Sequence, residues 1–100
     1  MIQDYQGDPN FVILDVRSPG EYASGYIENA INMCILCSAA FEEELLALDP
    51  TLTYLVYCQS GGRSGSASTI MAEVGFTNVY NMLGGLSQWE AEGFPVVEPE

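Results

Sequence analysis

Basic side chains are almost absent from this 100-residue chain. It has no lysine and no histidine, and its two arginines, Arg17 and Arg63, face 14 acidic residues. The formal net charge of −12 repels phosphate backbones, which excludes nucleic acid as the main binding partner. Without histidine, a catalytic pair of the cysteine–histidine kind is excluded as well. Three explanations of the acidic excess stay open: a basic protein partner, a salty cytoplasm, or simple solubility.

Long apolar runs and regular cysteine spacing are also missing. No hydrophobic stretch approaches the roughly 20 residues of a membrane-spanning helix, so we expect no membrane contact. The three cysteines cannot all pair, and no charged and apolar leader follows Met1. Both features argue against a secreted disulfide scaffold and for a reducing cytoplasm. The length suits a single domain over 1–100, because two separate cores would need a longer chain.

Strand-like and helix-like segments alternate along the chain. Short apolar runs predict strands at 11–14, 30–33, 52–57 and 79–80, and helical spacing predicts helices at 18–25, 41–48, 64–74 and 86–91. The first helix has the clearest start, with Ser18 at the N-cap, Pro19 at the first helical position and Glu21 as capping-box partner. The alternation predicts an α/β domain of three layers, with a mostly parallel sheet between helices.

The best candidate for a reactive group is Cys58, which follows a predicted strand and precedes a glycine-rich turn. Ligands of parallel sheets bind beyond the carboxyl ends of the strands. Gly61 and Gly62 allow backbone N–H groups to curl around an anion in front of a helix, which lowers the pKa of a cysteine. The loop also supplies one permanent positive charge and two hydroxyl groups: Arg63, Ser60 and Ser64. The plainer alternatives are a buried core cysteine, turn glycines and a surface arginine.

A second pair of cysteines, Cys34 and Cys37, has the spacing of a thioredoxin-like pair or of half a zinc site. No further cysteine pair or histidine accompanies them, so we expect no metal and no cofactor. The two interpretations left open are ordinary buried thiols and resolving thiols that exchange with Cys58.

Three groups of residues are spread along nearly the whole chain. They are the loop Cys58-Gln59-Ser60-Gly61-Gly62-Arg63, the amino-terminal segments 14–17, 21–22 and 25–32, and the carboxyl-terminal segments 75–76, Val79, 84–85, Trp89 and 93–96. The loop resembles the active-site loop of the rhodanese family of sulfurtransferases, and the other segments resemble the amino-terminal and carboxyl-terminal signatures of that family.

The resemblance implies a rhodanese-type α/β domain with a sheet of about five strands. It also implies that the Cys58 thiolate takes sulfane sulfur from thiosulfate or a persulfide donor and passes it to cyanide, a thiol or a protein. The loop amides and Arg63 would then steady the anionic persulfide. The other loop residues are expected to bind substrate: Gln59, Ser60, Gly61, Gly62 and Ser64. Three residues are expected to fix the first loop through hydrogen bonds and an ion pair: Asp15, Arg17 and Glu21.

The sequence departs from the family pattern in two places. Tyr26 stands where many relatives have histidine, and the loop carries a single basic residue. Relatives adapted to thiosulfate often carry more positive charge near the sulfur, so a persulfide on a partner protein is expected to suit this site better.

Two other functions compete with sulfur transfer as explanations of the loop. The related phosphatases have one residue more between cysteine and arginine than the four that separate Cys58 from Arg63, so this loop suits a sulfur atom better than a phosphate. The main alternative is a non-catalytic module that binds sulfur, senses redox state or binds a protein.

Overall fold

The computed structural model describes residues 9–35 and 41–98. Strands and helices alternate in this part of the chain, in the order β1 (Phe11–Asp15), α2 (Pro19–Ala23), β2 (Ile31–Asn32), α3 (Phe41–Leu45), β3 (Thr53–Tyr57), α4 (Gly62–Glu73), β4 (Asn78–Asn81) and α5 (Gly85–Ala91). Each element expected from the sequence has a counterpart among them, with shifted ends. None of the helices in the described ranges is long and apolar enough to cross a membrane.

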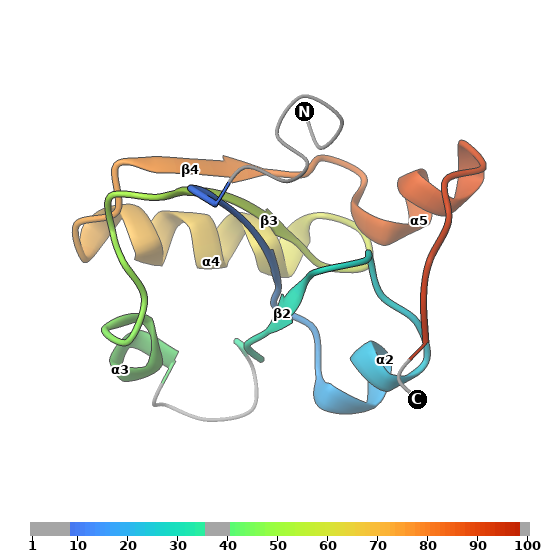
Figure 1. Ribbon diagram of the computed structural model, residues 1–100, viewed down its shortest axis with the longest axis horizontal. Helices are drawn as coiled ribbons and strands as arrows, with labels where there is room; N and C mark the ends of the chain where they lie inside the picture. Colours follow the sequence, from blue (N-terminus) through green and yellow to red (C-terminus); the bar gives the residue numbers. More distant parts are fainter. Residues whose placement is uncertain (1–8, 36–40, 99–100) are drawn as a thin grey trace.

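The strands form one parallel sheet in the order β2-β1-β3-β4. This confirms the expected α/β fold, but the described residues form four strands, where the family resemblance implied about five. Outside these strands, Tyr26 and Val97 form an isolated antiparallel bridge. Figure 1 shows β3 and β4 running towards the end of the molecule where α2 and α5 lie.

Helices cover both faces of the sheet. Neighbouring residues of a strand point to opposite faces, so apolar side chains of β1 are buried under helices on each side. On one face, Leu14 belongs to a buried cluster with Phe41 of α3 and Met71 of α4. On the other face, Ile13 belongs to a cluster with Leu86 of α5. The predicted three-layer arrangement is therefore confirmed. Trp89 packs against the second cluster.

The two helices next to Cys58 begin in different ways. At α2 the predicted capping box is present: the Glu21 N–H donates to Ser18 Oγ and the Ser18 N–H donates to Glu21 Oε1, each at 3.2 Å. By contrast, α4 begins at Gly62, two residues before the predicted start at Ser64. Its N-cap is Gly61, whose φ of 113° favours glycine. The chain therefore turns from the end of β3 into α4 within a few residues.

Candidate active site

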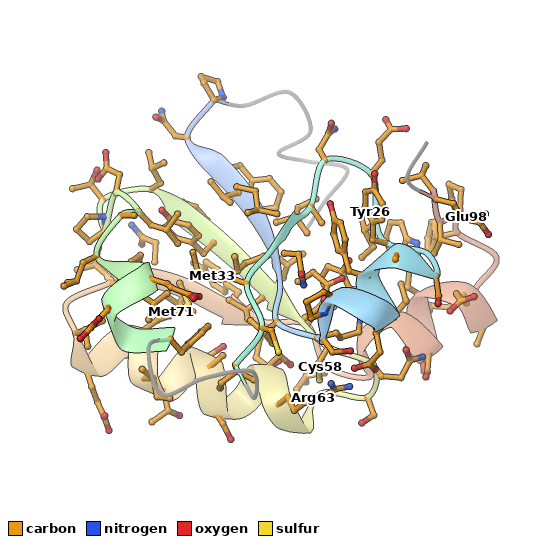
Figure 2. All side chains as sticks on the ribbon, turned by 90° about the horizontal axis from the view of Figure 1, so that it is seen from below. Tyr26, Met33, Cys58, Arg63, Met71 and Glu98 are labelled. Carbon is orange, nitrogen blue, oxygen red and sulfur yellow. The ribbon has the colours of Figure 1, made fainter. Side chains whose placement is uncertain are left out.

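Cys58 lies at the carboxyl end of β3, and its side chain is only 1 % exposed. Its Sγ atom accepts hydrogen bonds from the backbone N–H of Gly61 at 3.0 Å and of Ser64 at 3.4 Å. The sulfur is thus surrounded by donors of the turn that begins α4, as the glycine pattern predicted. Figure 2 shows Cys58 and Arg63 in the same part of the molecule, near α2.

The environment favours the thiolate form of Cys58. Burial raises the pKa of the thiol. Hydrogen bonds lower it by more than burial raises it, and they come from the Ser64 side chain and from the backbone N–H groups of Ser64, Gly61 and Ser60. The pKa of Cys58 is therefore below its usual value. A lower pKa increases the fraction of thiolate near neutral pH, and the thiolate is the nucleophile. The loop therefore activates Cys58 without a histidine.

Ser64 is fully buried beside Cys58. The Cys58 thiol donates to Ser64 Oγ at 3.5 Å, and the Ser64 hydroxyl lies 3.1 Å from the Gly61 carbonyl oxygen and 2.5 Å from Asn81 Oδ1, both possible acceptors. A hydroxyl has one proton and rotates freely about its C–O bond, so it can donate that proton to only one of these acceptors or to an ionised Cys58. Asn81 was not foreseen in this role. The available signal was its position at the carboxyl end of a predicted strand.

Arg63 and Glu21 form a close ion pair between the loop and α2. Nη1 of Arg63 lies 2.6 Å from Glu21 Oε1, and Nη2 lies 2.9 Å from Oε2. The hydrogen bond to Glu21 and the negative charge of Cys58 both raise the pKa of Arg63. Glu21 was expected to fix the first loop. It caps α2 and also binds an arginine 42 positions further along the chain.

Asp15 and Arg17 form a separate, buried ion pair with an Nη2–Oδ2 distance of 2.7 Å. Arg17 also donates to the Gly25 carbonyl oxygen at 2.7 Å, and the Tyr57 hydroxyl donates to Asp15 Oδ2 at 2.8 Å. These contacts hold the first loop to β3, which is consistent with the supporting role expected of Asp15 and Arg17. The part played by Tyr57 was missed, because an apolar strand gave no sign of a buried hydroxyl partner.

Gly84 and Gly85, at the start of α5, position the start of the loop. The Leu86 N–H donates to the Cys58 carbonyl oxygen at 2.9 Å, and the Ser87 N–H donates to the Gln59 carbonyl oxygen at 3.0 Å. Gly85 allows this approach, since a Cβ atom there would lie 2.5 Å from the Cys58 carbonyl oxygen.

Two other loop residues expected to bind substrate lie away from the sulfur contacts. The Gln59 side chain donates to Ser87 Oγ at 2.8 Å, so its amide is directed to α5. Gly62 is exposed at the first position of α4. The substrate-binding roles of the loop residues stay predictions.

Only one residue of the second cysteine pair is described. Cys34 follows β2 and is half-buried, and Cys37 falls outside the described residues. The redox role of the pair therefore stays a prediction. Within 9–35 and 41–98, no three cysteine or acidic side chains gather so that they would hold a metal ion.

Comparison with known proteins points to one family. The family description "Rhodanese-like domain" matches residues 2–92. The chain is 36 % identical over 91 residues to thiosulfate sulfurtransferase 16 of Arabidopsis thaliana, covering 82 % of this chain and 76 % of that protein. It is 30 % identical over 89 residues to a sulfurtransferase of Allochromatium vinosum, covering 89 % and 80 %. The crystal structure of a rhodanese-related protein from Thermoplasma volcanium superposes with a TM-score of 0.81 at 34 % identity, covering 95 % and 91 %.

The same domain also matches part of a protein with another activity. The chain is 33 % identical over 99 residues to a tRNA uridine(34) hydroxylase of Yersinia pestis, and it covers 27 % of that protein. Proteins that contain this domain are thus not all named as sulfurtransferases.

Proposed function

Because the chain belongs to the rhodanese-like family, we propose that it is a catalytic sulfurtransferase in which Cys58 carries the transferred sulfur as a persulfide. The observation that supports this most is the pair of backbone N–H groups, from Gly61 and Ser64, that point at Cys58 Sγ. We further propose that residues 1–100 act as one domain.

The proposed reaction has two steps. In the first, the Cys58 thiolate attacks the sulfane sulfur of the donor. The bond between that sulfur and the rest of the donor breaks, and the leaving group departs with the electron pair, as sulfite when thiosulfate is the donor. In the second, an acceptor such as cyanide attacks the terminal sulfur of the persulfide, forms thiocyanate and releases the Cys58 thiolate. Covalent catalysis thus divides one difficult transfer into two easier ones.

The loop is suited to both anions of the reaction, the Cys58 thiolate and the Cys58 persulfide. The N–H groups that face Sγ are fixed by the start of α4, so they need no rearrangement when charge develops there. The Ser64 hydroxyl adds a donor that can rotate towards the sulfur, and Arg63, which is paired with Glu21, lies at the edge of the loop. Because a ring of this size encloses one atom, it favours a sulfur over a phosphate.

The proposed partners are a small sulfur donor or a protein that carries a persulfide, and not nucleic acid or membrane. Cys58 must be a free thiol to accept sulfur, and it is free in the structure. We propose the cytoplasm as the compartment, because it keeps thiols reduced.

Turnover separates an enzyme from a binding module. Native protein and Cys58→Ser would be incubated with a sulfane-sulfur donor and cyanide, both in large molar excess over the protein. The amount of thiocyanate formed per protein molecule would then be measured. Thiosulfate and a protein persulfide would be used as donors in parallel. The proposal expects multiple turnovers with at least one donor and none in the variant. Formation of thiocyanate only up to the protein concentration, or none, would instead favour a sulfur-binding or redox-sensing module.

A further inference from the structure

Neither arginine of the chain offers an unpaired positive charge to a small anion. Arg17 is 2 % exposed and paired with Asp15, while Arg63 donates through both terminal nitrogens to both carboxylate oxygens of Glu21. The sequence contains no lysine or histidine that would substitute for them. The cation nearest the sulfur is therefore neutralised by an acidic side chain from α2.

Glu21 is held in this position independently of Arg63. Its Oε1 atom accepts from the Ser18 backbone N–H at 3.2 Å and from the Ser18 hydroxyl at 3.1 Å, both at the start of α2. The hydrogen bond from Arg63 lowers the pKa of Glu21 to about 2, more than its partial burial raises it. The carboxylate is thus charged throughout the physiological pH range and opposes the charge of Arg63 at every such pH.

We infer, on the premise of the proposed sulfurtransferase function, that Glu21 is a specificity-determining residue. By neutralising Arg63, it leaves the backbone N–H groups of Gly61 and Ser64 as the main attraction for negative charge at the sulfur. These donors favour one anionic sulfur atom, whereas the net charge of −12 opposes a small dianion. The site therefore selects donors of low negative charge, such as the persulfide of a thiol, over thiosulfate.

The test compares two donors that transfer the same atom but differ in charge. Thiosulfate is a dianion that leaves sulfite, and methanethiosulfonate is a monoanion that leaves methanesulfinate. With cyanide as the common acceptor, kcat/KM for each donor reports the first step, and the ratio of thiosulfate to methanethiosulfonate cancels effects shared by both. The variants are Glu21→Gln, Arg63→Gln and the double variant. Glu73→Gln, an exposed change at the far end of α4, controls for net charge.

The expected pattern follows from Coulomb energy, which is proportional to donor charge. Glu21→Gln should raise the rate about tenfold with thiosulfate and about threefold with methanethiosulfonate, so their ratio rises about threefold. Arg63→Gln leaves the carboxylate uncompensated and should lower the ratio by a similar factor. In the double variant both charges are gone, so the ratio should return to the native value. Glu73→Gln should leave it unchanged, because water and salt screen a distant exposed charge.

Several results would overturn the inference. One is the same ratio in native protein, Glu21→Gln and Arg63→Gln, which would show that the ion pair only supports the loop. Another is a double variant that keeps the raised ratio of Glu21→Gln. If Glu21→Gln does not fold, as judged by circular dichroism, the comparison of Arg63→Gln with the double variant decides the matter, because the ratio rises between them only if the charge of Glu21 opposes the dianion.

A failure of sulfur transfer itself would be recognised separately. In that case neither donor gives turnover with native protein, and the inference is tested by alkylation of Cys58 with iodoacetate, an anion, and iodoacetamide, which is neutral. The rate with iodoacetate divided by the rate with iodoacetamide should rise about threefold in Glu21→Gln and fall in Arg63→Gln. An unchanged alkylation ratio would refute the role of Glu21 whatever the activity.

Discussion

Gly85→Ala tests how strongly the start of α5 positions the active-site loop. A Cβ atom at this residue would lie 2.5 Å from the Cys58 carbonyl oxygen and 2.7 Å from the Gln59 carbonyl carbon. Both neighbours are backbone atoms, so relief requires the loop to move. The φ of Gly85 is 56°, which adds a cost of about 1–2 kcal/mol for any other residue. With about 1–3 kcal/mol for overpacking, the expected loss of unfolding free energy is about 2–5 kcal/mol.

Two other glycines separate the contributions to this loss. Gly75 has a φ of 107° but open space around it, so Gly75→Ala should cost about 1–2 kcal/mol from backbone strain alone. Gly20 has open space and an ordinary φ in α2, so Gly20→Ala should be neutral or stabilise by up to about 1 kcal/mol. All three substitutions add one methyl group, and urea unfolding measures each free energy.

The displacement of the loop should also be visible at the sulfur. If Gly85→Ala moves the Cys58 carbonyl, it weakens the hydrogen bonds that lower the pKa of the thiol. The rate of Cys58 alkylation by iodoacetamide should then fall at neutral pH and recover at higher pH, whereas Gly75→Ala should leave it unchanged. Equal stability losses in Gly85→Ala and Gly75→Ala, with identical alkylation profiles, would refute the reasoning.

The other predictions concern single contacts. Ser64→Ala removes a donor to the Cys58 thiolate, so alkylation at neutral pH should slow about tenfold, and an unchanged pH profile would contradict this. Tyr57→Phe removes a buried hydroxyl with two hydrogen-bond partners and should lower the free energy of unfolding in urea by about 1–3 kcal/mol. Tyr80→Phe, at a residue 49 % exposed, is the control and should leave it unchanged. Equal effects of the two substitutions would be evidence against the buried network. The pKa of Glu21 is lowered in the folded protein from 4.5 to about 2, so its ion pair contributes stability above pH 4.5 that is lost as the pH falls towards 2. Its carboxylate side chain is 36 % exposed, so screening limits the contribution to about 1 kcal/mol, and native protein should lose this much relative to Glu21→Gln over that range.

Local sequence patterns predicted the elements well. The capping box of Ser18 and Glu21 spans three residues, so its geometry is almost independent of the rest of the fold. Cys58 was recognised because a buried strand, a glycine turn and a helix are adjacent in the sequence. The start of α4 was placed two residues too late, since its N-cap is Gly61 in a left-handed conformation, without a side-chain cap that the sequence would reveal.

Contacts between distant segments were beyond the sequence analysis. Glu21 and Arg63 are 42 positions apart, and each has an acceptable local explanation, as a helix cap and as a loop cation. Only the parallel order of β1 and β3 brings the segments that follow these strands together. The contact of Ser64 with Asn81 likewise depends on the pairing of β3 with β4. The sequence predicted a mostly parallel sheet but not the order of its strands, so it did not predict the partners of these side chains.

The central claim is that Cys58 carries sulfur, and intact-protein mass spectrometry tests it most directly. Reduced native protein and Cys58→Ser would be incubated with thiosulfate and, separately, with a protein persulfide, then freed of donor and weighed before and after addition of cyanide. The account predicts a gain of one sulfur atom in the native protein, no such gain in the variant, and return to the original mass with cyanide. A native protein that gains no sulfur from either donor, or a Cys58→Ser variant that gains as much, would contradict it.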